Sequence, residues 1–252
     1  MRLDNYLVEK GFFVSRTKAK QAISRGEIYI DGNNDVKPSL NMEDDVCYKI
    51  NRVCENSFVS LGGFKLDKAL KDFKFNVDGL IVADIGASTG GFTDCLLKNG
   101  AKKVFAVDLN DDLLHHTLKE DERVVRIIKN ARELKKSDFE DQIQLIVADL
   151  SFISITYVLN VFSGILDDKK HLLILIKPQF EANKKKKLKN GIVKDKKDML
   201  ESCRNVFNKA LECSFSPIAF TIAPLVEGKN VEFLMLFQKN GLQKIKIDDI
   251  NF

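Results

Sequence analysis

The stretch Ile81–Asp94 reads IVADIGASTGGFTD, and it decides the fold that we expect for the chain. An apolar run over residues 80–85 is long enough for one buried strand, and a flexible turn of small residues follows at Gly86–Gly91. A helical pattern resumes at Phe92–Lys98. Strand, glycine-rich turn and helix in this order form the nucleotide-binding element of a doubly wound sheet, because glycine lets the backbone come close to a ligand.

The rest of the larger part of the chain alternates between strand and helix patterns, which predicts an α/β fold with a mostly parallel sheet of seven strands. Strands are expected at residues 80–85, 103–107, 124–128, 144–148, 171–176, 217–222 and 231–237. Helices are expected at residues 64–73, 92–98, 113–118, 155–165 and 197–211. In such a doubly wound sheet, helices cover both faces and functional side chains lie at the carboxyl ends of the strands.

The pattern divides the chain into two domains. At 252 residues the chain has room for one small and one medium domain, and a hydrophobic share of 44% supports a real core. Residues 1–50 have the pattern of a small α+β domain. Periodicity is lost at residues 51–61, so we expect a linker there and the larger domain at residues 62–252.

The small domain is expected to contain two short helices and a pair of strands. The helices are predicted at Arg2–Lys10 and Arg16–Arg25, and a glycine follows each of them and ends it. Short strands around Ile28–Ile30 and Val36 would flank a turn at Asp31-Gly32.

Charge is unevenly distributed, although the net charge of the whole chain is only +4. The first 26 residues hold six basic and two acidic side chains, and Arg16 and Lys20 lie one helical turn apart, away from the apolar face. Residues 181–198 hold eight lysines and three acids. Either segment could be a solvated surface or a contact for nucleic acid, and the second could be an RNA-facing lid over the glycine turn.

Composition argues against several classes of protein. The five cysteines show no paired metal spacing and there are only three histidines, so a zinc site or disulfide framework is not expected and a reducing cytoplasm fits. No apolar run approaches the ~18 residues that span a membrane, and we expect no signal peptide.

The glycine turn could bind either of two cofactors. A dinucleotide site favours G-x-G-x-x-G, whereas this turn reads Gly86-x-x-x-Gly90-Gly91. Asp108 ends the next strand and suits the ribose diol of NAD or of S-adenosylmethionine. Asp84, directly before the turn, favours the cationic S-adenosylmethionine, because an acid would repel the pyrophosphate of a dinucleotide. A helix cap for Asp84 and a turn residue for Asp108 are the structural alternatives.

Two lysines and two carboxylates are expected to meet at the carboxyl edge of the sheet. Asp149, Lys177 and Glu232 lie at strand ends, and Lys65 lies on the helix that precedes the sheet. Enzymes that methylate a base amine usually have a proline and an aromatic residue after this acid, and no proline directly follows Asp149. Methylation of a pyrimidine carbon needs a cysteine nucleophile, and no cysteine lies near Asp149. The set suits methyl transfer to a ribose hydroxyl, which has to be oriented and relieved of its proton.

The role of Lys177 stays open between two possibilities. Two carboxylates close to this lysine would stabilise its charged form and make it a poorer base. It would then orient the hydroxyl and stabilise the developing alkoxide instead. Surface positions for Lys177 and Glu232 are the structural alternatives.

These motifs resemble those of known families. Lys65, Asp149, Lys177 and Glu232, in this order, resemble the tetrad of FtsJ-type ribose 2′-O-methyltransferases. The segments SLGGFKL, DIGASTGGFTD, ADLSFIS, IKPQFE and KNVEF resemble motifs of the TlyA family. Near the N-terminus, RLDNYL, SRTKAKQAISRGEIYIDG and VKPS resemble the alpha-L RNA-binding domain of ribosomal protein four of the small subunit and of pseudouridine synthases.

The resemblance implies a Rossmann-like methyltransferase that transfers a methyl group from S-adenosylmethionine to the 2′-hydroxyl of a cytidine in ribosomal RNA. The tetrad would be catalytic, with Lys177 nearest the hydroxyl. RNA contacts are implied for Arg2, Arg16, Lys18, Lys20 and Lys37. The residues expected at the cofactor are Asp84, Gly86, Ala87, Ser88, Gly90, Gly91, Phe92, Asp108, Asn130, Asp149 and Phe152. The partner would be ribosomal RNA within ribosomal subunits, and short family members resemble the kind that modifies only the large subunit.

Three other functions compete with this interpretation. The chain could be an RNA-binding assembly factor with an inactive methyltransferase fold, or an NAD-dependent oxidoreductase. It could also be a membrane-active toxin, since some relatives carry a haemolysin label, although no long amphipathic or spanning segment supports that. We expect a cytoplasmic monomer that binds no metal.

Overall fold

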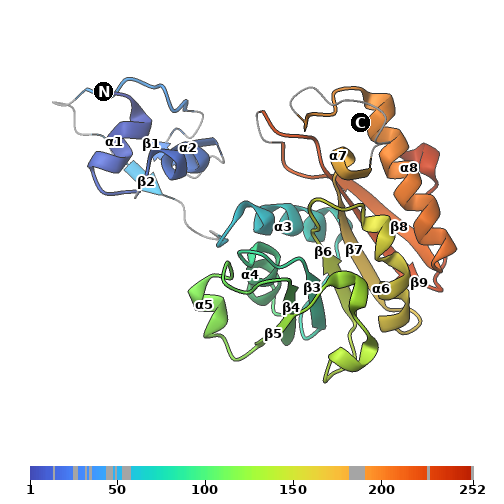
Figure 1. The fold of residues 1–252 in the computed structure, drawn as a ribbon. Helices are drawn as coiled ribbons and strands as arrows, with labels where there is room; N and C mark the ends of the chain where they lie inside the picture. Colours follow the sequence, from blue (N-terminus) through green and yellow to red (C-terminus); the bar gives the residue numbers. More distant parts are fainter. Residues whose placement is uncertain are drawn as a thin grey trace. The chain divides into compact units, whose positions relative to one another are not determined.

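The computed structural model describes residues 1–13, 15–24, 28–31, 33, 36–43, 48, 50–52, 58–181, 191–225 and 228–250. The chain divides into two compact units, residues 1–57 and 58–252 (Figure 1). The division falls within the segment 51–61, where the sequence predicts a linker.

The N-terminal unit packs two helices and a two-stranded sheet around a small core. Helices α1 (Leu3–Glu9) and α2 (Arg16–Ser24) lie where the sequence predicts them. Strand β1 (Ile28–Ile30) pairs antiparallel with β2 (Ile50–Arg52). The predicted strand at Val36 is wrong, because the hydrogen-bonding partner of β1 comes from much later in the chain. The buried core side chains include Leu3, Leu7, Ala19, Ala22, Ile23 and Ile28.

The larger unit is built on one seven-stranded sheet with the order β5-β4-β3-β6-β7-β9-β8. The strands are β3 (Ile81–Ile85), β4 (Lys103–Asp108), β5 (Val124–Ile128), β6 (Leu145–Ala148), β7 (His171–Ile176), β8 (Phe215–Ile222) and β9 (Phe233–Lys239). The five strands from β5 to β7 are parallel, and β9 lies antiparallel between β7 and β8. The predicted doubly wound α/β sheet is therefore confirmed.

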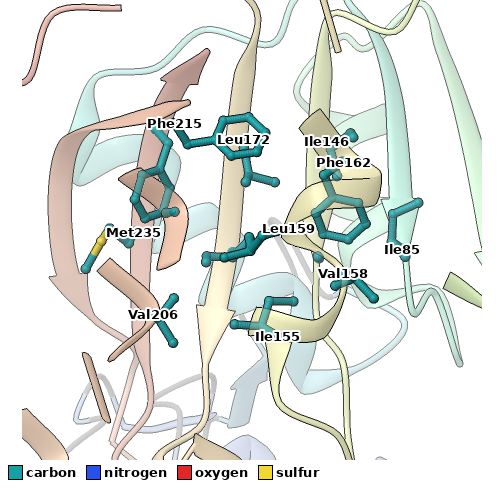
Figure 2. Close-up of a cluster of buried hydrophobic side chains, with 14 of the residues drawn as sticks. Ile85, Ile146, Ile155, Val158, Leu159, Phe162, Leu172, Val206, Phe215 and Met235 are labelled. Carbon is teal, nitrogen blue, oxygen red and sulfur yellow. The ribbon is translucent and has the colours of Figure 1, made fainter. Parts of the chain in front are cut away.

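Helices cover both faces of this sheet. Helices α3 (Leu61–Phe73), α4 (Gly91–Lys98) and α5 (His116–Lys119) pack on one face. Helices α6 (Leu159–Ile165) and α8 (Lys196–Glu212) pack on the other, and the short helix α7 (Pro178–Glu181) follows β7 (Figure 1). Figure 2 shows the second face, where Ile146 and Leu172 of the sheet lie against Leu159 and Phe162 of α6.

Three of the helices predicted in the larger domain differ from the observed helices by more than one residue at an end. The first begins at Leu61 rather than residue 64, with Ser60 directly before it. In place of a helix at 113–118, only the short α5 forms, because His115 caps its start by accepting from the backbone nitrogen of Thr117. The predicted helix at 155–165 is a 3-10 turn at Ile155–Tyr157 followed by α6.

Candidate active site

The predicted polar residues share one face of the sheet because side chains alternate along a strand. In β7, Leu173 and Leu175 pack on the face that α3 and α4 cover, so Lys177 continues that row. The same spacing of two leads from Val147 to Asp149 in β6, and from Leu234 back to Glu232 before β9. By the same spacing of two, Asp84 lies on the same face of β3 as Val82, and Asp108 lies on the same face of β4 as Ala106.

The glycine turn after β3 has a backbone that only glycine fits well. Gly86 and Gly90 have φ angles of +86° and +89°, in the left-handed region. A Cβ on Gly86 would lie 2.6 Å from the carbonyl oxygen of Asp149, and one on Gly90 would lie 2.2 Å from Leu118 Cδ1. The backbone N–H groups of Gly86 and Ala87 donate to the carbonyl oxygen of Val107, which holds the turn against β4.

Helices α3 and α4 begin side by side next to this turn. A Cβ on Gly91 would lie 2.2 Å from Ser60 Oγ and 2.9 Å from the backbone nitrogen of Gly63. Gly91 of STGG and the SLGG segment therefore meet where the two helices begin, whereas a Cβ on Gly63 would lie 2.3 Å from the side chain of Phe58. The exposed N–H groups of helix N-termini attract anionic groups such as a carboxylate.

A cavity of about 200 Å³ opens where the turn, the two helix starts and the strand ends meet. Its lining residues are Ser60, Gly62, Gly86, Ala87, Ser88, Thr89, Gly91, Phe92, Asp149, Ser151 and Lys177. Seven of them were expected from the sequence at the cofactor or at the reacting hydroxyl. Ser60, Gly62, Thr89 and Ser151 were not singled out, although each lies within a motif that the family resemblance uses.

Lys177 is buried and is held by two neighbours from the end of β6. Its Nζ lies 2.5 Å from Asp149 Oδ1, an ion pair without hydrogen-bond alignment, and donates a hydrogen bond of 2.8 Å to Ser151 Oγ. An ammonium group has three N–H donors. Because Lys177 also lines the cavity, at least one donor remains for a ligand there.

Lys65 and Glu232 form a second ion pair. Lys65 Nζ donates to Glu232 Oε2 at 2.5 Å, and both side chains are less than one-fifth exposed. The register Ile176↔Phe233 between β7 and β9 brings residue 232 beside the strand end that carries Lys177. Sequence reasoning expected both carboxylates at Lys177, but each lysine pairs with its own carboxylate. Glu232 also precedes β9 rather than beginning it.

Asp84 is completely buried beneath the turn and is not among the residues that line the cavity. Its Oδ2 accepts a 2.6 Å hydrogen bond from Thr93 Oγ1 of α4, while Oδ1 has no hydrogen-bond partner within the described part of the chain. Burial raises the pKa of Asp84 to about 7, and the nearby carboxylates of Asp149 and Asp108 act in the same direction. A cation bound near the turn would stabilise this carboxylate.

Four other residues expected at the cofactor lie outside the cavity lining. Asp108 accepts from the backbone nitrogens of Ser88 at 2.8 Å and Leu109 at 2.7 Å. Asn130 caps a 3-10 turn, and Gly90 packs under α5. Phe152 is 89% exposed with φ +69°, and its ring centroid lies 5.6 Å from that of Phe180.

The basic residues predicted to contact RNA lie in the N-terminal unit. Arg2, Arg16 and Lys20 gather around the buried carboxylate of Asp4. Lys18 and Lys37 are exposed. Half of the lysine-rich segment at 181–198, predicted as a solvated loop or RNA-facing lid, lies outside the described residues, which resume at Gly191, and α8 begins at Lys196.

Metal-binding and membrane-spanning features are absent from the described residues. No group of three histidine, cysteine or acidic side chains is placed to hold a metal ion there. In that part of the chain, Cys95, Cys203 and Cys213 are buried free thiols, whereas Cys47 and Cys54 lie outside it. None of its helices is long and apolar enough to cross a membrane.

The fold and the site together define a class of protein. A solved structure of an S-adenosylmethionine dependent methyltransferase from Mesorhizobium loti aligns with a TM-score of 0.54 at 14% identity, over 71% of this chain and 100% of its own. At this identity the likeness shows the fold alone, which is that of the Rossmann-like methyltransferases.

The family follows from sequence comparison. The profile of the FtsJ-like methyltransferases matches residues 58–240, and that of the S4 domain matches residues 1–33. The chain belongs to the TlyA family of FtsJ-like methyltransferases, with an S4 domain at its N-terminus, as its motifs predict.

Three relatives illustrate the family. Hemolysin A of Brachyspira hyodysenteriae is 40% identical over 94% of this chain and 99% of its own length. The 16S/23S rRNA (cytidine-2′-O)-methyltransferase TlyA of Mycobacterium tuberculosis is 36% identical over 93% of this chain and 88% of its own. The 23S rRNA (cytidine-2′-O)-methyltransferase TlyA of Campylobacter jejuni is 32% identical over 95% of this chain and 100% of its own.

Proposed function

We propose that this protein transfers a methyl group from S-adenosylmethionine to the ribose 2′-hydroxyl of a cytidine in ribosomal RNA. One observation carries the proposal: the ion pair of Lys177 and Asp149 borders the same cavity as the glycine turn. Two relatives are named for this activity, and both names include 23S rRNA, which supports the large-subunit RNA as the substrate. The cytoplasm, where ribosomal RNA resides, is the proposed location.

The residues around the cavity suit S-adenosylmethionine, which when bound supplies an electrophilic methyl group on a sulfonium. The glycine turn at 86–91 packs closely against Asp149 and α5, which fixes its backbone at the edge of the cavity. The adjoining starts of α3 and α4 suit the carboxylate of the cofactor. Asp84 has a buried oxygen without a hydrogen-bond partner and without an ion pair in the described structure, and its negative charge suits the positive charge of the cofactor.

Lys177 is the group proposed to bind the acceptor hydroxyl. Asp149 and Ser151 fix its ammonium group, so that its remaining donor can orient the ribose oxygen and stabilise negative charge as the proton leaves. The pair of Lys65 and Glu232 is proposed to complete the catalytic set. Each pair is neutral overall, so neither repels a sulfonium.

Cofactor binding is proposed to extend beyond the cavity lining. Asp108 would approach the ribose of the cofactor while its carboxylate supports the turn through Ser88. Asn130 follows the end of β5 and Phe152 follows the end of β6, at the carboxyl edge of the sheet, and both are kept as proposed contacts. Gly90 is proposed to act indirectly, by allowing α5 to pack under the turn.

Methyl transfer by the Lys177→Ala variant tests the proposal. We expect transfer to purified large ribosomal subunits to fall by at least about 100-fold, the usual loss when one preorganised donor is removed. Calorimetric affinity for S-adenosylmethionine should stay near that of the wild type. Lys68→Ala is the matched control, because Lys68 lies on α3 and pairs with Asp72 outside the cavity.

Three outcomes would contradict the proposal. Undiminished transfer by Lys177→Ala would remove that residue from catalysis. Wild-type protein that binds ribosomal particles without transferring a methyl group would indicate an assembly factor with an inactive fold. Binding of NAD without binding of S-adenosylmethionine would indicate an oxidoreductase.

A further inference from the structure

Asp4 is a fully buried acid in the first turn of α1. Acidic side chains are almost never fully buried unless they are paired. Its carboxylate accepts hydrogen bonds from Arg2 Nε at 3.1 Å, Arg2 Nη2 at 3.2 Å and Arg16 Nη2 at 3.2 Å. Lys20 Nζ lies 3.6 Å away, and the backbone nitrogen of Asn5 donates at 3.1 Å. Three cations therefore converge on one acid.

The sequence explains this convergence. Arg2 directly precedes α1, and Arg16 and Lys20 lie one turn apart on α2, which packs against α1. The carboxylate is thus reached from the start of one helix and from one face of the other. Arg2 donates from Nε and from Nη2 to the two oxygens of Asp4, and this bidentate contact fixes the orientation of the planar guanidinium group.

The three cations remain available to a ligand. The side chains of Arg2, Arg16 and Lys20 are 47%, 52% and 47% exposed, whereas that of Asp4 is 0% exposed. Each guanidinium has five N–H donors and uses only one or two of them on Asp4. One negative charge cannot neutralise three positive charges, so this surface stays cationic.

Asp4 stays ionised under physiological conditions. Burial by itself would raise the pKa of Asp4, but hydrogen bonds from Arg2 and Arg16 outweigh it and lower the pKa to about 2. The acid is consequently a permanent anchor for the three cations rather than a titrating group.

We propose that Asp4 is a positioning residue, which holds Arg2, Arg16 and Lys20 in the orientation that receives RNA phosphates. The inference rests on the proposed function, since it takes ribosomal RNA as the ligand of this surface. Long cationic side chains lose rotamer freedom when they bind, and holding them in place beforehand reduces that loss. Phosphate contacts of this kind fix the register of a protein on RNA.

Positioning and simple electrostatics make opposite predictions for Asp4→Asn. The substitution removes a negative charge, so electrostatics alone would strengthen binding to RNA phosphates. If Asp4 positions the cations, binding weakens although the protein becomes more positive. Glu9→Gln is the matched control, because it makes the same change of charge at an exposed position of the same helix.

The test measures affinity of the full chain for large-subunit ribosomal RNA over a range of salt concentrations. Asp4→Asn is expected to bind at least about fivefold more weakly than Glu9→Gln. The plot of log affinity against log salt concentration should also be less steep for Asp4→Asn, by about 1 for each phosphate that the cations no longer bind. Affinity of Asp4→Asn equal to or above that of Glu9→Gln would overturn the positioning role. If the wild type does not bind the RNA, the proposed function fails as well, so the two failures can be distinguished.

A second measurement needs no variant and keeps the proposal testable if Asp4→Asn does not fold. NMR relaxation at Arg Nε of the free wild-type protein is expected to show Arg2 and Arg16 as rigid as the backbone. Arg204 is the internal reference, since its contact to the exposed Asp248 is 3.9 Å. If Arg2 and Arg16 are as mobile as Arg204, the proposal is overturned.

Discussion

Asp84 is the residue at which burial and charge conflict most strongly. It lies without solvent contact under the glycine turn, with two other carboxylates near it and one oxygen without a hydrogen-bond partner in the described structure. Burying an ionised acid without a partner is costly. We propose that the positive charge of a cofactor bound at the turn stabilises the ionised form of Asp84.

The stability of the cofactor-free protein should depend on Asp84 in a defined direction. A pKa raised from 3.8 to about 7 means that the folded state holds the proton more tightly than the unfolded state. The contribution of Asp84 to stability is then lost as pH rises through that window, by roughly 1.4 kcal/mol per pH unit. Asp84→Asn should remove this loss.

Denaturant unfolding at pH 5 and pH 8 checks the prediction. The free energy of unfolding of Asp84→Asn relative to the wild type should increase between the two pH values. Thr93→Val is the comparison variant, because it removes the hydrogen bond that Asp84 accepts and leaves the charge of the protein unchanged. A difference between Asp84→Asn and wild type that is the same at both pH values would contradict the account.

Helix α7 fixes the loop that carries Ser151. Glu181, at the end of α7, accepts from Ser154 Oγ at 2.5 Å and from the backbone nitrogen of Ile155 at 2.8 Å. Burial raises the pKa of Glu181 above its ordinary value, although these two hydrogen bonds oppose the shift. The motifs IKPQFE and ADLSFIS are thus parts of one structural unit beside the cavity.

Removing this link should affect both stability and methyl transfer. Glu181→Ala leaves two donors without their acceptor, which we expect to cost about 1–3 kcal/mol in the free energy of unfolding. Methyl transfer should fall more than affinity for S-adenosylmethionine, because the loop supports Ser151 and Lys177. Glu181→Gln keeps one carbonyl oxygen as an acceptor and should retain most of both properties. Unchanged transfer and stability in Glu181→Ala would show that α7 does not support the loop.

Local pattern predicted the strands well, because a buried parallel strand is a continuous apolar run between turns. The limits of β5 and β7 match the prediction to the residue. The pairing of Lys65 with Glu232 could not be predicted in this way, since it depends on β9 lying beside β7. The partner of β1 was missed for the same reason, because β2 is distant in the sequence.

At the scale of the whole molecule, the two units are proposed to divide the work. We keep residues 1–50 as the proposed RNA-binding domain, 51–61 as the linker and 62–252 as the methyltransferase domain. The structure adds that Phe58 and Ser60 belong with the larger unit, since Phe58 is buried in its core and Ser60 lines the cavity.

Fragments of the chain test this division. Residues 61–252 should bind S-adenosylmethionine poorly and should not methylate ribosomal RNA, because they lack Ser60, Phe58 and the S4 domain. Residues 58–252 should regain most cofactor binding in calorimetry but still fail to modify RNA. Full turnover on ribosomal particles by either fragment would contradict the proposed role of the N-terminal unit.

The distribution of charge within the N-terminal unit predicts an RNA-binding surface, whereas the net charge of the whole chain does not. A net charge of +4 says little about nucleic acid, whereas the cations around Asp4 form a defined surface in the structure. Sequence reasoning found these cations but not the acid that holds them, because a lone aspartate among six basic residues gives no sign that it is buried.

Mass spectrometry of ribosomal RNA tests the central claim most directly. Cells that lack the gene are compared with the same cells carrying the wild-type gene or the Lys177→Ala variant at equal protein level. We predict one 2′-O-methylcytidine in large-subunit RNA that is present with the wild-type gene and absent both without it and with Lys177→Ala. Identical 2′-O-methylation in all three strains would contradict the account.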